Sequence, residues 1–398
     1  MGSSSDFEWG FTTSSLAAEG AAPRADWAAW EAAGHAPRSS DGSGFASDYA
    51  DDLELLASLG AQSVRLNLDW SRLEPWPRQV DNDAVDYYRG VLQAARDAGL
   101  AVWATLHHTT APGWFVDDER GFVDASSRSN FWARHVDRTA EQFDDLVGGW
   151  VPMEDPIGGA LRGWLLGTRP PGRRDPDAAR DAVVASLEAN FDAWKLLRSG
   201  DQPVMTVVGL PTVHAARPEA REERGLWEHV LWRSWARVIS DGWIDVPWRG
   251  PVVDEALIDA FDIIGIAYDH PIAVDVDSSF GPYPATARTD ASGFAPNAEE
   301  LGVVLRRVAE LVPDKPLLVA SNGVTTADDD WRDELLRATA GQIDLARADG
   351  VSVIGYHHDT GIDGYHESRG FAGQRGLITR DRELKPSART YRELATRP

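Results

Sequence analysis

The feature that most constrains the fold of this chain is a regular alternation of apolar, strand-like runs with amphipathic helical stretches. Eight runs of each kind follow one another from end to end, and strict alternation predicts a parallel sheet whose strands are joined by helices. Eight is also the number of parallel strands that closes into a barrel. The predicted strands are 7–12, 63–68, 101–106, 150–153, 204–210, 261–268, 317–320 and 351–356.

Helical stretches fill the gaps between these runs, and glycine marks the ends of several. Gly60, Gly99 and Gly350 each stand where the left-handed backbone that ends a helix is most easily adopted by glycine. No linker or repeat interrupts the pattern, so we predict one α/β domain, a single (β/α)8 TIM barrel over residues 1–398, with residues 1–6 flexible. Long loops are expected at 168–177 and 277–295, and helices at 49–59, 84–98, 131–146, 178–197, 227–240, 298–311, 331–348 and 388–395.

Charge and composition exclude several classes of function. The chain carries 39 Lys and Arg against 63 Asp and Glu, a formal net charge of −24, which argues against nucleic acid and anionic membrane as partners. Without cysteine it has no disulfide and no thiolate nucleophile. No apolar run is long enough to cross a membrane and no secretory leader opens the chain, so we predict a cytoplasmic protein. No phosphate-binding loop indicates a nucleotide cofactor, and no pattern indicates an oligomeric state.

Polar residues follow most of the predicted strands, where a barrel of this class places its chemistry. Because the carboxyl ends of the strands meet at one rim, these residues are expected to line one pocket. The 17 Trp residues, although most are expected in the core, supply flat faces that suit a ring-shaped ligand. The polar segments are 69–72, 107–110, 154–156, 268–270, 321–323 and 357–360.

Several short motifs, taken in order, resemble those of the family 1 glycoside hydrolases, which are β-glucosidase-like (β/α)8 barrels. They are FEWG at 7–10, DWSRLEP at 69–75, TLHH at 105–108, DIIGIAY at 262–268 and KPS at 385–387. No one of them is specific, but their order and register extend over nearly the whole chain. The resemblance implies a small-molecule glycoside, or a related natural product, as the ligand.

The two catalytic motifs of that family are altered. Retaining enzymes use two glutamates, one as acid/base and one as nucleophile. Where the family has Thr-x-Asn-Glu-Pro, residues 152–156 read PMEDP, so Asp155 takes the acid/base position and Glu154 that of the asparagine. Where the family has Thr-Glu-Asn-Gly, residues 320–323 read ASNG, so Ser321 replaces the nucleophile.

The loss of the nucleophilic carboxylate removes the usual double displacement. A serine hydroxyl without an adjacent base is a poor nucleophile at neutral pH. In the family, the positions of Arg65 and Tyr268 flank the nucleophile, so their donors are expected to face Ser321 or an anionic group of the ligand.

The sugar contacts implied by the resemblance are altered as well. The first-strand glutamine is Ala17, the stacking tryptophan of strand 8 is Asp359, and the paired Glu-Trp is His366-Glu367. An ordinary glucoside pocket would not survive these replacements, although the new residues are polar and still suit ligand binding. The pocket residues that remain are Arg65, His108, Tyr268 and Asn322.

The replacements supply acid/base chemistry of a different kind. Glu154 and Asp155 disfavour each other's ionisation if they point together, and one would then stay protonated as a general acid. Strand alternation turns His357 and Asp359 to the same side and His358 away, so a His–Asp pair is a candidate base. Alternatively, Asp359 and His366 only hold loops by pairing with arginines.

A metal site is a further alternative, with His108, His357, Asp359 and Glu154 as ligands. These residues lack the short spacing of a metal motif, so we predict neither metal nor cofactor.

Three functions follow from these residues. The first is an enzyme that uses acid/base chemistry, led by Asp155, on a glycoside or glycoside-like natural product. The second is a glycoside hydrolase whose second carboxylate is relocated to Asp359, Glu154 or Glu367. The third is an inactive, sugar-binding pseudo-glycosidase.

Overall fold

The structure is a computed structural model that describes residues 7–118, 120–248, 250 and 252–397. The expectation of a flexible segment at 1–6 lies outside the described residues. Within them, no helix is long and apolar enough to cross a membrane.

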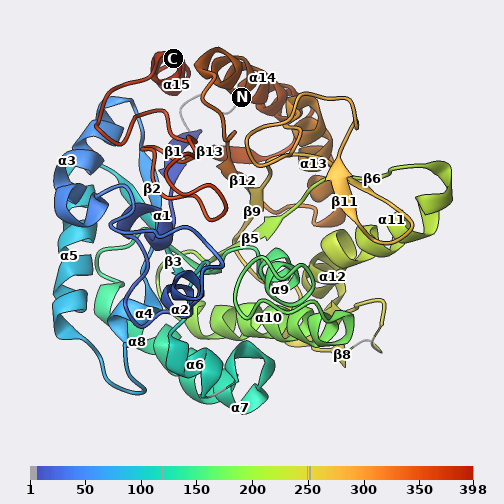
Figure 1. Cartoon of the computed structure of the whole chain (residues 1–398), viewed down its shortest axis with the longest axis horizontal. Helices are drawn as coiled ribbons and strands as arrows, with labels where there is room; N and C mark the ends of the chain where they lie inside the picture. The colour runs from blue at the N-terminus through green and yellow to red at the C-terminus, as the bar shows by residue number, and fades with distance from the viewer. Residues whose placement is uncertain (1–6, 119, 249, 251, 398) are drawn as a thin grey trace.

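A closed parallel barrel forms the centre of the molecule, as the alternation predicted (Figure 1). In the described part of the chain, eight strands are hydrogen-bonded in the order β4-β3-β2-β1-β13-β12-β9-β5. Bridges from Trp150 to Val204 and from Glu154 to Val207 join the last strand to the first and close the ring. The strands are β1 (Glu8–Thr12), β2 (Ser63–Asn67), β3 (Ala101–His107), β4 (Gly149–Met153), β5 (Met205–Gly209), β9 (Ile263–Ala267), β12 (Leu317–Asn322) and β13 (Val353–Asp359).

Helices surround the barrel, and several of them begin or end at the residues that capping chemistry predicts. Asp81 accepts hydrogen bonds from the first N–H groups of α5, and Gly99 follows that helix with a φ of 78°. The longer helices are α3 (Phe45–Ser58), α5 (Asn82–Asp97), α8 (Ala133–Phe143), α9 (Pro156–Trp164), α10 (Pro176–Leu197), α11 (Arg221–Glu228), α12 (Ser234–Asp241), α13 (Ala298–Leu311), α14 (Asp329–Ala348) and α15 (Pro386–Ala395). The shorter ones are α1 (Ser15–Glu19), α2 (Asp26–Ala32), α4 (Trp70–Leu73), α6 (Gly113–Asp117) and α7 (Ala125–Ser127).

Several details differ from the prediction. The last strand, β13, continues through His357 and His358 to Asp359, so these residues belong to the barrel wall and not to a following loop. The expected loop 277–295 contains β11 (Phe280–Pro282), which joins β10 (Ile272–Val274) and β6 (Val213–Ala215) in a small sheet beside α11 (Figure 1). Strands of three residues are too short for alternation to reveal them. A second small pair is β7 (Trp243–Ile244) with β8 (Val252–Val253).

The apolar core has two main layers, besides a small cluster around Trp27. The larger layer lies between the outer wall of the barrel and the helices. The smaller one fills the interior of the barrel and contains Trp103, Val151, Met205, Val207, Ile263, Leu318 and Ala320. Because this inner core packs the lower barrel, the polar residues at the carboxyl ends of the strands form the floor of the mouth.

Candidate active site

Arg65 and Glu154 form an ion pair on the floor of the mouth. The guanidinium of Arg65, from β2, donates to the Glu154 carboxylate beyond β4 and to the carbonyl oxygen of Ala320 at 3.0 Å. The Glu154 side chain is 10% exposed. Burial, with the nearby charges of Asp155 and Asp359, raises the pKa of Glu154 even against the lowering effect of Arg65.

Asp155 is turned away from that floor and caps a helix. Its backbone is left-handed, with a φ of 40°, and its carboxylate accepts hydrogen bonds from the N–H groups of Gly158 in α9 (3.1 Å) and Gly209 in β5 (3.0 Å). Arg162 donates to the other oxygen at 3.0 Å. Asp155 and Ser321 share one rim, as the alignment requires, but the cap holds the Asp155 carboxylate beside β5.

Arg375 joins two aspartates on the opposite side of the mouth. It donates to Asp359 at the end of β13 (2.8 Å) and to Asp269 just beyond β9 (2.5 Å). The hydroxyl of Ser321 donates to the same oxygen of Asp359 at 3.4 Å. Ser321 therefore faces a carboxylate, and Asp359 keeps a side-chain exposure of 28%.

An ion pair between Arg169 and Glu367 spans the mouth. Arg169 donates from two nitrogens to the two carboxylate oxygens of Glu367, at 2.7 and 2.6 Å. The hydroxyl of Thr109 donates to Glu367 at 3.3 Å, and Nδ1 of His108 lies 2.7 Å from the same hydroxyl. Burial opposes ionisation of Glu367, but Arg169 outweighs it, and the pKa of Glu367 is lowered.

His357 lies below the mouth and does not pair with Asp359. Alternation does turn both side chains into the barrel, but successive inward positions on a strand belong to different layers. The fully buried ring of His357 places Nε2 2.9 Å from the hydroxyl of Ser63 and 3.1 Å from Glu8. Burial lowers the pKa of His357. The expected His–Asp pair is thus replaced by a His–Glu pair deeper in the barrel.

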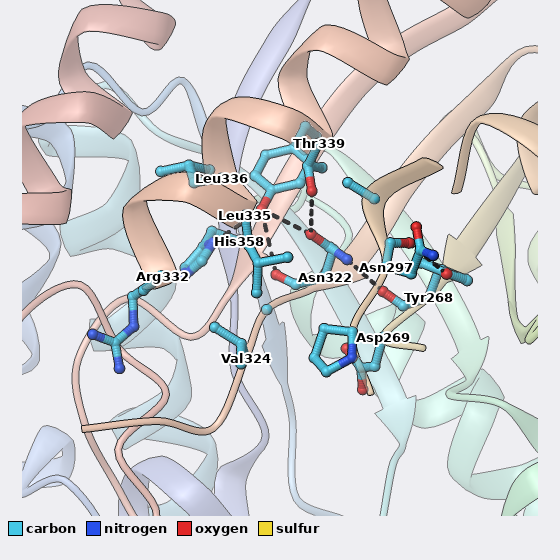
Figure 2. A pocket seen from close by; sticks show the side chains of 14 residues that line it. Tyr268, Asp269, Asn297, Asn322, Val324, Arg332, Leu335, Leu336, Thr339 and His358 are labelled. Atoms are coloured by element: carbon cyan, nitrogen blue, oxygen red, sulfur yellow. Dashed lines mark hydrogen bonds between the residues drawn. The ribbon is translucent and has the colours of Figure 1, made fainter. Parts of the chain in front are cut away.

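Tyr268 and Asn322 face the helices instead of the mouth, contrary to the expectation from the resemblance. The Tyr268 hydroxyl donates to the carbonyl oxygen of Asn297 at 2.7 Å. Asn322 donates to the carbonyl oxygen of Tyr268 and accepts from Thr339, as Figure 2 shows. Together with His358 they line a small cavity between the barrel wall and α14. Strand alternation explains this, because Ala267 and Asp269 take the inward positions on either side of Tyr268.

His366 lies in the loop after β13. Its Nε2 is 3.4 Å from the hydroxyl of Ser292, which connects this loop to the loop before α13. Burial, followed by the charge of Arg375, lowers the pKa of His366. Among the described residues, no group of three or more His, Asp or Glu side chains is arranged to hold a metal ion.

Residues important to this site escaped prediction from the sequence. Asp269 lies in the predicted polar segment 268–270, but its inward position was assigned to Tyr268, an error that counting alternate positions from Ala267 would have avoided. The three arginines that pair with Asp155, Glu367 and Asp359 have no sequence signal, because they belong to α9 or to irregular loops. They are Arg162, Arg169 and Arg375.

Comparison with known proteins agrees with the fold and the motifs. The family model described as Glycosyl hydrolase family 1 matches residues 3–242. The chain is 24% identical to a β-galactosidase from Sulfolobus acidocaldarius, over 94% of this chain and 89% of that protein. It is also 24% identical to β-glucosidase 3 from Oryza sativa subsp. japonica, over 98% of this chain and 91% of that protein. The β-glycosidase from Pyrococcus horikoshii superposes with a TM-score of 0.89 at 25% identity, over 98% of this chain and 94% of that one.

Proposed function

The chain belongs to glycosyl hydrolase family 1, and we propose that it is an enzyme that acts by acid/base chemistry on a glycoside or a glycoside-like small natural product. The names of its relatives, a β-galactosidase and β-glucosidases, support a glycoside as the ligand class. With serine at position 321, the reaction proceeds without a glycosyl–carboxylate ester.

The observation that carries the proposal is the pair of carboxyl groups on opposite sides of the mouth. Glu154 follows β4 and Asp359 ends β13, and three strands separate β4 from β13 in either direction around the ring. Burial raises the pKa of Glu154, the direction that a proton donor requires, whereas Arg375 and Ser321 both donate to Asp359. A proton donor and a proton acceptor on opposite sides of the mouth are what acid/base catalysis requires.

In the hydrolytic form of this chemistry, Glu154 protonates the leaving oxygen and Asp359 takes a proton from the attacking water. The second carboxylate is then relocated from position 321 to Asp359, and the anomeric centre is inverted. Elimination or rearrangement would use the same proton donor and acceptor without water. We assign the proton donor to Glu154 and not to Asp155, because Asp155 accepts three hydrogen bonds within the protein.

A second function, that of a non-catalytic ligand-binding protein, is favoured by one observation. The mouth carboxylates Glu154, Glu367, Asp269 and Asp359 each accept from an arginine, and such pairs oppose proton transfer by stabilising the ionised form. The catalytic and the non-catalytic function predict different results for Glu154→Gln, because only an enzyme has a turnover for this substitution to lower.

The test is a panel of aryl glycosides, with the anomeric form of the product followed by proton NMR. The enzyme proposal expects turnover that falls about 10²–10⁴-fold in Glu154→Gln, with ligand affinity much less affected. Asp155→Asn is the matched control for a neighbouring carboxylate, and we expect it to retain most of the turnover. Ligand binding without turnover across the panel supports the non-catalytic function. A retained anomeric configuration contradicts the inverting route.

A further inference from the structure

The ion pair that spans the mouth is connected to His108 through one hydroxyl group. Arg169 belongs to the loop between α9 and α10, and Glu367 to the loop that follows β13. Since β4 and β13 are diametrically opposite in the ring, the two side chains meet across the opening. Thr109, just beyond β3, approaches the same carboxylate and adjoins His108.

The positions of the hydrogens along the path from Glu367 through Thr109 to His108 follow from the ionised carboxylate of Glu367. Glu367 accepts two hydrogen bonds from Arg169, which keeps it ionised and leaves it only able to accept. The Thr109 hydroxyl has a single hydrogen, and donating it to Glu367 leaves only its lone pairs for the imidazole. At 2.7 Å from that oxygen, Nδ1 of His108 must then be the donor.

The other ring nitrogen of His108, Nε2, has no hydrogen-bond partner among the described residues. Among the residues that the structure describes, none is hydrogen-bonded to Nε2 of His108, and that nitrogen is not enclosed as a buried atom. Burial, followed by the charges of Arg169 and Arg65, holds the pKa of His108 well below its usual value. A neutral ring with hydrogen on Nδ1 presents a lone pair at Nε2.

We propose that the Arg169–Glu367 pair, acting through the Thr109 hydroxyl, fixes the tautomer of His108 so that Nδ1 carries the hydrogen and Nε2 is an obligatory acceptor at the mouth. Thr109 and Glu367 are positioning residues. His108 selects a ligand that offers a hydroxyl hydrogen at this point and disfavours one with an ether oxygen there by about tenfold. This selection rests on the proposed function, whereas the tautomer does not.

The tautomer is measured directly in the ligand-free protein. Two-bond ¹H–¹⁵N correlation spectra of protein labelled with ¹⁵N-histidine distinguish the Nδ1–H form, the Nε2–H form and the imidazolium. The chain has 10 His residues, and His108→Gln identifies the signals of His108 by their disappearance. We expect the Nδ1–H form at neutral pH. The Nε2–H form or the imidazolium in the unaltered protein overturns the proposal.

Variants test the path from the ion pair to the ring. In Glu367→Leu the Thr109 hydroxyl is free to donate to Nδ1, so the Nε2–H form should appear. Thr109→Val should give a mixture of forms and Thr109→Ser should restore the Nδ1–H form. Thr110→Val is the matched control, because the Thr110 hydroxyl donates to Asp69 (3.3 Å) and lies outside this path. If Glu367→Leu does not fold, the Thr109 variants decide, and spectra unchanged in Thr109→Val contradict the proposal.

A kinetic measurement separates this inference from the proposed function. On any glycoside that the enzyme turns over, Thr109→Val should lower kcat/KM about tenfold and Thr109→Ser should restore it. Absence of turnover in the unaltered protein counts against the proposed function, while the tautomer spectra still decide the inference.

Discussion

Replacing Asp155 should damage stability before it damages chemistry. Its carboxylate caps α9 through Gly158, satisfies the partly buried N–H of Gly209 and pairs with Arg162. Alanine at this position removes all three acceptor interactions. Asparagine keeps one acceptor oxygen for the two N–H groups and tolerates the left-handed backbone at a φ of 40°.

The expected loss of stability in the Asp155 variants follows from these contacts. A lost N-cap costs about 1 kcal/mol, and the Gly209 N–H, left without its acceptor in a partly buried position, costs about 2 kcal/mol. The ion pair contributes little, because the Arg162 side chain is 35% exposed. Alanine in a left-handed backbone costs roughly 1 kcal/mol more. We therefore expect Asp155→Ala to lower the free energy of unfolding by about 4 kcal/mol, and Asp155→Asn by about 1 kcal/mol.

Equilibrium unfolding in urea, followed by far-UV circular dichroism, measures both values. The two variants should differ in midpoint at an unchanged m-value, since the exposed surface is the same. A value for Asp155→Ala within 1 kcal/mol of the unaltered protein would refute the capping argument. A stable Asp155→Asn that binds ligand but has lost turnover a hundredfold would return the proton donor to Asp155.

Three further results are expected. In Gly209→Ala the new Cβ would lie 2.7 Å from the carboxyl carbon of Asp155, so this substitution should lower the free energy of unfolding by about 1–3 kcal/mol. In the Asp155→Ala background the carboxyl group is absent, so thermal unfolding should show a smaller loss of stability for the same substitution. Burial raises the pKa of Glu19 to about 7 from 4.5, so the folded state binds the proton more tightly and this contribution to stability is lost as pH rises from about 4.5 to about 7. It amounts to about 3 kcal/mol, and Glu19→Gln should flatten the pH dependence measured by unfolding at pH 4.5 and 8. Ser321→Glu should not produce strong β-glucosidase activity on an aryl glucoside, because the new carboxylate would face Asp359, which Ser321 now contacts. Strong activity in this variant would show that the glucose pocket is intact and would contradict this prediction.

Much of the fold was predictable from the sequence because its signals are local. Apolar runs and helical periodicity located the eight barrel strands found in the described residues, and glycines such as Gly99 located helix ends with positive φ. Alternation also predicted correctly that His357 and Asp359 share a side and that His358 faces outward, where its ring contacts Tyr356. The depth of each residue within the barrel does not follow from alternation, which is why His357 appeared to be a partner of Asp359.

The candidate site was less predictable because its partners are distant in sequence. Asp155 and Gly209 meet because β4 and β5 close the ring, and this contact turns the carboxylate away from the mouth. Tyr268 was assigned to the pocket by its resemblance, although the inward position belongs to Asp269. Arg169 approaches Glu367 across 198 positions of sequence, and no local pattern marks such a pair.

The charges at the mouth form one electrostatic unit. A carboxylate withdrawn from water is stabilised by a counter-charge or by several donors, and among the described residues Glu154, Glu367, Asp269 and Asp359 at the mouth each accept from an arginine. Removing one residue of a pair leaves the charge of the other without a partner, which typically lowers the free energy of unfolding by about 3–5 kcal/mol when the pair is buried. Arg375 contacts both Asp359 and Asp269, so its loss would leave two like charges facing each other. The departures of this chain from the family motifs are therefore physically coupled, and the chemistry of its mouth follows from the arrangement of these pairs as a set.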